Sequence, residues 1–257
     1  MREIHSTAVV SPDAQLGENV VVEPFAVIED NVEVGDGSHI GSSVLLASGA
    51  RLGKNVRVFH GAAIGSVPQD LKFAGEETLA IVGDNTVVRE YATINRGTAH
   101  SGQTRVGSDC LLMAYSHVAH DCSLGDNVIM GNSATLAGHI EVHDYAILSG
   151  LLPVHQFVKI GKHAMIGGGY RVPMDICPYA LAAGYPLRIA GLNIVGLRRR
   201  GFSRQAINNL QQAFKLLFFG GLNTSQAVDR IKDELEQTEE IKTILDFIAA
   251  SHRGLCK

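Results

Sequence analysis

The sequence contains few cysteines, and none of them lies close to another along the chain. Cys110, Cys122, Cys177 and Cys256 form no Cys-x-x-Cys pair. A zinc ribbon and a disulfide framework are therefore not indicated. We interpret the four thiols as small, apolar, buried side chains, and we expect no metal site.

Long apolar runs and an excess of positive charge are also missing. No run approaches the roughly 20 apolar residues of a membrane-spanning helix. The first ten residues, MREIHSTAVV, lack the basic start and apolar core of a secretory signal. The net charge is −4 at pH 7, so nucleic acid is not an expected partner. These absences favour a cytoplasmic protein without a transmembrane segment.

An apolar residue occupies almost every sixth position of the first two thirds of the chain. Between Val10 and Val172, 25 of the 28 positions in this phase are apolar, and the exceptions are Asp70, Glu76 and His100. A period of six fits neither a helix nor an ordinary strand. It is typical of a solenoid with three short parallel strands per coil, each sending one side chain inward. The sequence therefore predicts a mainly β fold, a parallel β-helix of hexapeptide repeats.

Glycines and loops add detail to this prediction. Eleven glycines directly follow an inward position, where we expect tight corners. Two segments, 66–80 and 95–105, depart from the period and are expected to be loops. Both interrupt the column of strands that later carries several histidines. The first loop contains Gln69, Asp70 and Lys72, which can contact a polar substrate and its phosphate, although a charged surface loop is the simpler interpretation.

After Val172 the period ends, and helical patterns follow a connector with three prolines. We predict a β-helix over 1–187 and a C-terminal α-helical domain over 188–257. Such a domain can serve merely as a cap on the open edge of the solenoid. Its charge suggests more, because no acidic residue lies between Asp175 and Asp229. The same stretch contains six basic residues: Arg188, Arg198, Arg199, Arg200, Arg204 and Lys215. The pair Arg199–Arg200 can clamp a diphosphate or face an acidic protein surface.

The period also locates the candidate chemistry. Val118, Leu136 and Val154 are 18 residues apart and should occupy the same place on successive coils. Four histidines accompany them along one edge, at about 4.8 Å per coil: His117, His120, His139 and His155. Asp121 offers a carboxylate that can orient the imidazole of His120 and stabilise its protonated form.

The chain contains the motifs PQDLKFAGE, HVAHDC, NSATLAGHIEV, VHQF and NIVGLRRRGFSR. They closely resemble those of the bacterial UDP-N-acetylglucosamine 3-O-acyltransferases, the first enzymes of lipid A synthesis, and the resemblance spans essentially the whole chain. It implies a left-handed β-helix and a homotrimer with active sites between subunits. It also implies transfer of an (R)-3-hydroxyacyl group from acyl carrier protein to the glucosamine 3-hydroxyl, without a cofactor.

The resemblance implies roles for individual residues. His120 matches the general base, Asp121 its support, and the backbone N–H of Gly138 the donor to the oxyanion. Gly168 matches the far end of the acyl groove, where a glycine leaves space for a longer acyl chain. Contacts to the sugar and phosphates match Asp70, Lys72, His117, His139 and Gln156, and His155 matches a further active-site histidine. Nucleotide and phosphate contacts match Asn193, Arg199 and Arg200. We add Arg204 as a residue facing the acidic carrier protein.

One position departs from the family pattern, because Val195 stands where an acidic residue usually follows Asn-Ile. A polar contact to the nucleotide is therefore missing there. Alternative functions are acylation of a 3-amino sugar nucleotide, a zinc enzyme of the carbonic anhydrase kind, and a non-catalytic solenoid. An N-acyltransferase of the same pathway is disfavoured, because that family has an additional N-terminal domain and the repeats here begin by Val10.

Overall fold

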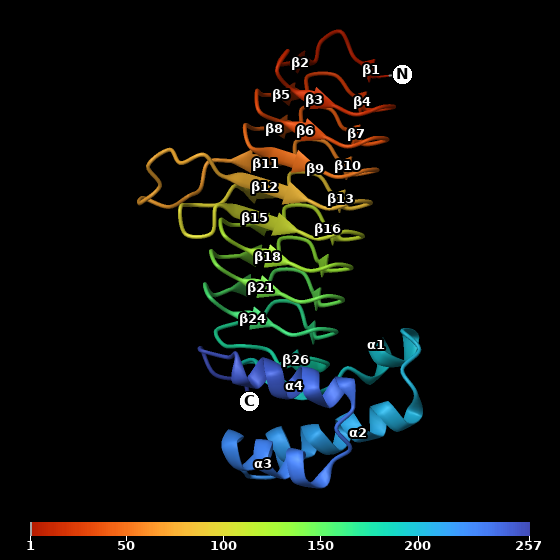
Figure 1. The fold of residues 1–257 in the computed structure, drawn as a ribbon, viewed down its shortest axis with the longest axis vertical. Coiled ribbons are helices and arrows are strands. Elements are labelled where there is room, and N and C mark those ends of the chain that lie inside the picture. Colours follow the sequence, from red (N-terminus) through yellow and green to blue (C-terminus); the bar gives the residue numbers. More distant parts are fainter. Residues whose placement is uncertain (1) are drawn as a thin grey trace.

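The computed structural model describes residues 2–257, and most of them form a parallel β-helix with a helical cap (Figure 1). Short strands stack along the axis into three sheets, one for each face of a triangular prism. Sheet A contains β1 (Glu3–Ile4), β4 (Val21–Val22), β7 (His39–Ile40), β10 (Arg57–Val58), β13 (Val87–Val88), β16 (Leu111–Leu112), β19 (Ile129–Met130), β22 (Ile147–Leu148), β25 (Met165–Ile166), β26 (Ala180–Ala183) and β27 (Arg188–Leu192). Sheet B contains β2 (Val9–Val10), β5 (Val27–Ile28), β8 (Leu45–Leu46), β11 (Ala63–Ser66), β14 (Thr93–Asn95), β17 (His117–Val118), β20 (Thr135–Leu136) and β23 (Pro153–Val154). Sheet C contains β3 (Gln15–Leu16), β6 (Glu33–Val34), β9 (Ala50–Leu52), β12 (Leu79–Val82), β15 (Gln103–Val106), β18 (Ser123–Leu124), β21 (Glu141–Val142) and β24 (Lys159–Ile160).

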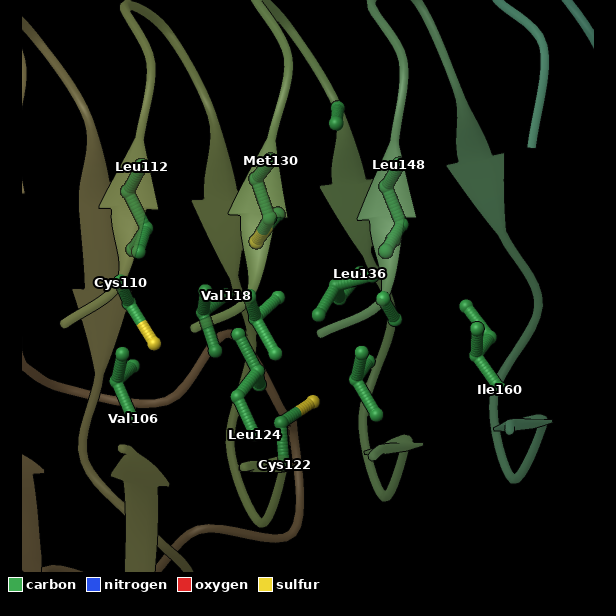
Figure 2. Packing of buried hydrophobic residues seen from close by; sticks show 14 of the residues in the cluster. Val106, Cys110, Leu112, Val118, Cys122, Leu124, Met130, Leu136, Leu148 and Ile160 are labelled. Atoms are coloured by element: carbon green, nitrogen blue, oxygen red, sulfur yellow. The ribbon is translucent and has the colours of Figure 1, made fainter. Parts of the chain in front are cut away.

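The predicted inward positions form the core. Every apolar residue in phase from Leu16 to Val172 is at most 7% exposed, and only Val10, in the first coil, is partly buried. Figure 2 shows Leu112, Met130 and Leu148 from consecutive coils in one row along the interior. Strands pair in parallel with the 18-residue offset, as in Val118 opposite Leu136.

The structure has a second inward position, two residues before each apolar one, which the sequence pattern missed. It holds many small residues, such as Ala62, Cys110, Cys122 and Ala134, each at most 2% exposed, and some larger ones, such as Ile140. The expected burial of the cysteines is thereby confirmed, and Cys177 and Cys256 are buried as well. Burial raises the pKa of the Cys110 thiol to about 11, so it stays protonated and unreactive.

At the corners, the left-handed backbone conformation and the close contacts between coils fall on different residues. Left-handed φ angles occur at non-glycine residues such as Asp121 (59°), His139 (62°) and Phe157 (63°). The glycines that follow inward positions are needed for another reason: consecutive coils approach each other so closely there that a side chain would clash. A Cβ at Gly35, for example, would lie 2.4 Å from the carbonyl oxygen of Gly53.

Two loops leave sheet B at the corner toward sheet C. Residues 67–78 connect β11 to β12, and residues 96–102 connect β14 to β15. Both project from the same side of the prism (Figure 1). They lie within the predicted loops, whose outermost residues belong to the flanking strands.

The helices cover the last coil (Figure 1). Strand β26 adds to β25 in parallel and β27 returns antiparallel, so sheet A continues to Leu192, five residues past the predicted domain boundary at 187. The helices are α1 (Ile194–Arg199), α2 (Arg204–Phe214) with a π-helical turn (Lys215–Phe219), α3 (Thr224–Glu234) and α4 (Glu239–Ala249). None of the helices in residues 2–257 has the length and apolar character that crossing a membrane requires.

Candidate active site

Three successive turns from sheet B to sheet C form what we call the histidine corner. They follow β17, β20 and β23 and comprise residues 119–121, 137–139 and 155–157. Because each coil repeats the same turn one strand spacing further along, residues 18 apart stack in columns. Asp121, His139 and Phe157 form one such column, and their shared left-handed backbone points the three side chains alike. The sequence prediction that histidines gather on one edge is thus met for His120 and His139.

His120 and Asp121 form a short hydrogen bond, with 2.7 Å between Nδ1 and Oδ2. An ionised carboxylate only accepts hydrogen bonds, so Nδ1 of His120 carries the hydrogen. The other ring nitrogen, Nε2, then holds a free lone pair. The imidazole is 12% exposed, enough for a ligand to reach it. This geometry makes Nε2 of His120 a base.

The carboxylate of Asp121 is fully buried and fully hydrogen-bonded. It accepts from the backbone N–H of Thr98 (3.0 Å), from the Thr98 hydroxyl (2.7 Å) and from Ser101. Burial by itself would raise the pKa of this carboxyl, but hydrogen bonds from Ser101, His120 and Thr98 outweigh it and hold the pKa well below its usual range. Asp121 is therefore ionised and stabilises a positive charge on His120.

His139 lies within the same cluster without sharing this hydrogen bond. Its Nδ1 is 3.8 Å from Oδ2 of Asp121, too far for a hydrogen bond. Its ring stacks on Phe157, with centroids 4.6 Å apart, and meets the rings of His100 and His120 edge-on. Burial lowers the pKa of His139, which favours the neutral imidazole.

Two further predicted residues border the cluster. Nδ1 of His117 lies 2.7 Å from the hydroxyl oxygen of Thr93, and burial lowers the pKa of this imidazole as well. Gly138 packs against the ring of His120, where a Cβ would lie 2.6 Å from Cε1. Among residues 2–257, the backbone N–H of Gly138 finds no hydrogen-bond acceptor. A free N–H donor thus lies directly beside the base.

The loop 67–78 brings a carboxylate toward the corner. Asp70 accepts a hydrogen bond from the backbone N–H of Lys72 at 3.0 Å. Its charge acts on His139, where it opposes the lowering of the pKa by burial. Gln69 and Lys72 are exposed.

A second group of predicted residues lies over sheet A. Asn193 is 4% exposed and begins α1, since its Oδ1 accepts from the N–H of Gly196 and its Nδ2 donates to the carbonyl of His163. Arg199 and Arg200 end the same short helix. With Val195 they border a groove whose floor is apolar: Ile147, Met165, Leu181 and Leu192.

The predicted site residues of one chain occupy three different corners of the prism. His120 lies at the turn from sheet B to sheet C, and Arg200 covers Tyr145 at the turn from C to A. Gly168 lies at the turn from A to B, beside Gly150.

His155 and Gln156 belong to the histidine corner, one coil beyond His139, and Arg204 is exposed at the start of α2. One chain alone therefore does not bring the base, Arg200 and Gly168 to one place.

The histidine corner also contains the donors of a metal site. Ligand atoms of His120, Asp121 and His139 lie within 4.8 Å of one another, a donor set that zinc accepts. In this structure, however, the oxygens of Asp121 accept hydrogen bonds from His120 and from the Thr98–Ser101 segment, which occupy the lone pairs that a metal ion would need.

Sequence reasoning missed the partners of Asp121. Thr98 and Ser101 lie in the loop 96–102, outside the hexapeptide period. The same loop carries His100, whose ring meets His139 and which was missed as well. The sequence did contain one signal for these residues, because the loop leaves the period next to the column that carries the histidines. Phe157 was also missed, although it is one coil from His139 in the same column.

Three sheets of stacked short strands, with an oriented histidine at one corner, define a hexapeptide-repeat transferase. The family model described as bacterial transferase hexapeptide (six repeats) matches residues 13–48 and 103–138. The model of the second domain of UDP N-acetylglucosamine O-acyltransferase matches residues 175–256. The chain belongs to the UDP-N-acetylglucosamine O-acyltransferase family.

Full-length relatives support this membership. The acyl-[acyl-carrier-protein]–UDP-N-acetylglucosamine O-acyltransferase of Trichlorobacter lovleyi is 52% identical over 99% of both chains. Its counterpart from Leptothrix cholodnii is 47% identical over 100% of both. The crystal structure of a UDP-N-acetylglucosamine acyltransferase from Bacteroides fragilis is 45% identical, covers 99% of this chain and 100% of its own, and superposes with a TM-score of 0.98. The expected left-handed β-helix and the acyltransferase class are confirmed.

Proposed function

We propose that the protein transfers an (R)-3-hydroxyacyl group from acyl carrier protein to the 3-hydroxyl of UDP-N-acetylglucosamine, the first step of lipid A biosynthesis. The observation that carries this proposal is the His120–Asp121 pair, with Nε2 of His120 free beside the unpaired N–H of Gly138. The names of the relatives support the same reaction.

The reaction proceeds by general-base catalysis. Nε2 of His120 takes the proton of the sugar 3-hydroxyl as its oxygen attacks the thioester carbonyl. Ionised Asp121 stabilises the imidazolium, and the N–H of Gly138 donates to the oxyanion of the tetrahedral intermediate. Collapse of the intermediate breaks the carbon–sulfur bond, and the departing thiolate receives the proton from His120. No acyl-enzyme and no cofactor are required.

The remaining predicted residues hold the substrates. The sugar and its phosphates contact Gln69, Asp70, Lys72, His117, His139, His155 and Gln156. The nucleotide and the diphosphate contact the start and end of α1, at Asn193, Arg199 and Arg200. Arg204 faces the acidic carrier protein, which approaches a stretch without acidic residues.

A homotrimer assembles these parts. The histidine corner, the Arg200 region and Gly168 lie on three corners of one prism, so neighbouring subunits must bring different corners together. Each active site then lies between subunits. Because both donor and acceptor are soluble metabolic intermediates, we place the trimer in the cytoplasm.

The test is acyl transfer from a panel of 3-hydroxyacyl carrier proteins to UDP-N-acetylglucosamine, followed by mass spectrometry, with His120→Ala in parallel. We expect product with the wild type and almost none with the variant. No product from folded, trimeric protein would overturn the proposal. The 3-amino analogue of the acceptor and metal analysis would then examine the two alternative functions.

A further inference from the structure

The C-terminal tail, residues 250–257, folds back onto the last coils of the β-helix. The N–H of Asp175 donates to the carbonyl of Gly254 (3.0 Å), and the N–H of Cys256 donates to the carbonyl of Asp175 (2.8 Å). The Asp175 carboxylate is buried and accepts from the backbone N–H of Lys159 and from the hydroxyl of Ser251. The tail is thus fixed to the prism by backbone and side-chain hydrogen bonds.

Arg253 extends from this tail to the histidine corner. Its Nε donates to the carbonyl of Pro173 at 3.1 Å, and its Nη1 donates to the carbonyl of Gln156 at 3.2 Å. The carbonyl of Gln156 also lies 3.1 Å from Nδ1 of His155. Since a carbonyl oxygen only accepts, Nδ1 of His155 carries the hydrogen, and its Nε2 remains an acceptor for a ligand.

The same turn is connected to the catalytic pair. The N–H of Phe157 donates to the carbonyl of Gly138 at 3.3 Å, and the ring of Phe157 stacks on His139. The ring of His139 in turn meets that of His120. Direct contacts therefore lead from Arg253 through residues 155–157 to His120.

We propose that the C-terminal tail is a positioning element of the active site and that Arg253 is its positioning residue. Arg253 fixes the turn 155–157, which sets the tautomer of His155 and holds Phe157 against His139. This proposal rests on the proposed function, in which His155 and Gln156 contact the sugar nucleotide. It adds a part of the chain that none of the recognised motifs includes.

The first experiment compares Arg253→Met with Arg253→Lys and a control, Arg230→Met. Arg230 pairs with Glu234 on the exposed face of α3, so its replacement removes an arginine without touching the corner. We expect Arg253→Met to raise the KM for UDP-N-acetylglucosamine about fivefold, with kcat within about twofold. Arg253→Lys should fall between, because an ammonium lacks the planar fork that reaches two carbonyls. Arg230→Met should match the wild type.

The second experiment repeats Arg253→Met in a His155→Ala background. If Arg253 acts through His155, its effect on KM should shrink to less than about twofold there. The same fold-change in both backgrounds would overturn the proposal, as would a lowered melting temperature with an unchanged KM. Failure of the proposed function looks different, because the wild type itself would then transfer no acyl group to this acceptor.

Discussion

The guanidinium carbon of Arg200 lies 5.0 Å from the centre of the Tyr145 ring, which it covers. The Tyr145 ring stacks on His163 at 4.7 Å, and His163 stacks on Tyr179 at 5.7 Å. Within residues 2–257, Arg200 forms no ion pair with a carboxylate. A guanidinium held by aromatic rings keeps its charge available for an anionic ligand.

Replacing Tyr145 tests this arrangement. Tyr145→Leu removes the ring beneath Arg200 and should raise the KM for UDP-N-acetylglucosamine about three- to tenfold. Tyr145→Phe keeps the ring and should stay close to the wild type. Steady-state kinetics with varied sugar nucleotide measures both. If the two variants behave alike, the ring does not position Arg200.

The aromatic column also predicts a pH dependence of stability. Burial, with the nearby charges of Arg200 and Lys162, lowers the pKa of His163 to about 4. In the unfolded chain it is about 6.5, so the unfolded state binds more protons between these values. Stability should therefore be complete above pH 6.5 and decrease as the pH falls toward 4.

His163→Phe isolates this contribution, because it keeps a ring and removes the titration. Relative to this variant, the wild type should lose up to about 3 kcal/mol of unfolding free energy between pH 7 and pH 4. Urea unfolding at several pH values measures the difference. Parallel pH curves for the two proteins would contradict the buried, neutral imidazole.

Asp121→Asn should lower kcat by about a hundredfold or more, with a small effect on KM. An amide can donate to His120, which favours the wrong tautomer, and it cannot stabilise the imidazolium. The other oxygen, Oδ1, keeps its hydrogen bonds from the backbone N–H of Thr98 and from Ser101, which should preserve the fold. Kinetics with circular dichroism as the folding control provides the measurement. A kcat within tenfold of the wild type would exclude an essential role for the carboxylate.

Gly138→Ala places a methyl group where the His120 ring now lies, 2.6 Å from Cε1. The imidazole must move away from the N–H donor, so we expect kcat to fall about a hundredfold. Ser123→Ala, at an exposed strand position, serves as the control for a small substitution elsewhere on the coil. Gly102→Ala would be less suitable, because the left-handed backbone of Gly102 would strain an alanine. Equal kcat for Gly138→Ala and the wild type would show that the base and this glycine do not act together.

The sequence predicted the apolar inward positions because hydrophobic burial acts equally on every coil. It did not reveal the second inward position, where polar residues such as Ser38 and Thr86 occur among alanine, cysteine and valine. Their hydroxyls are satisfied inside, since Ser38 donates to the carbonyl of Gly53 and Thr86 to that of Gly107. Polarity therefore hides Ser38 and Thr86 from a pattern of hydrophobic residues, although both are buried.

Site residues that lie on the repeating coils were predicted from the sequence, whereas those in loops and in the C-terminal tail were missed. Asp121 and His139 are 18 residues apart, so the repeat places His139 and the neighbouring His120 on one corner. Thr98 and Ser101 reach Asp121 from a loop, and Arg253 reaches Gln156 from the far end of the chain. Contacts between segments without a shared period depend on tertiary structure, which spacing alone does not specify.

Gly168 provides the test of acyl-chain selection. Gly168→Met should shift the preferred donor toward shorter 3-hydroxyacyl chains by filling the end of the groove. The structure adds a cost, because a Cβ at this position would lie 2.9 Å from the carbonyl oxygen of Gly150. We therefore expect a loss of about 1–3 kcal/mol in unfolding free energy as well.

Gly168→Ala separates the two effects, since it meets the same carbonyl but adds only one carbon. Its loss of stability should resemble that of Gly168→Met, while its chain preference should shift much less. Competition among carrier proteins with acyl chains of different length, read by mass spectrometry, measures the preference. An unchanged preference in Gly168→Met would place the end of the acyl groove at another corner of the prism.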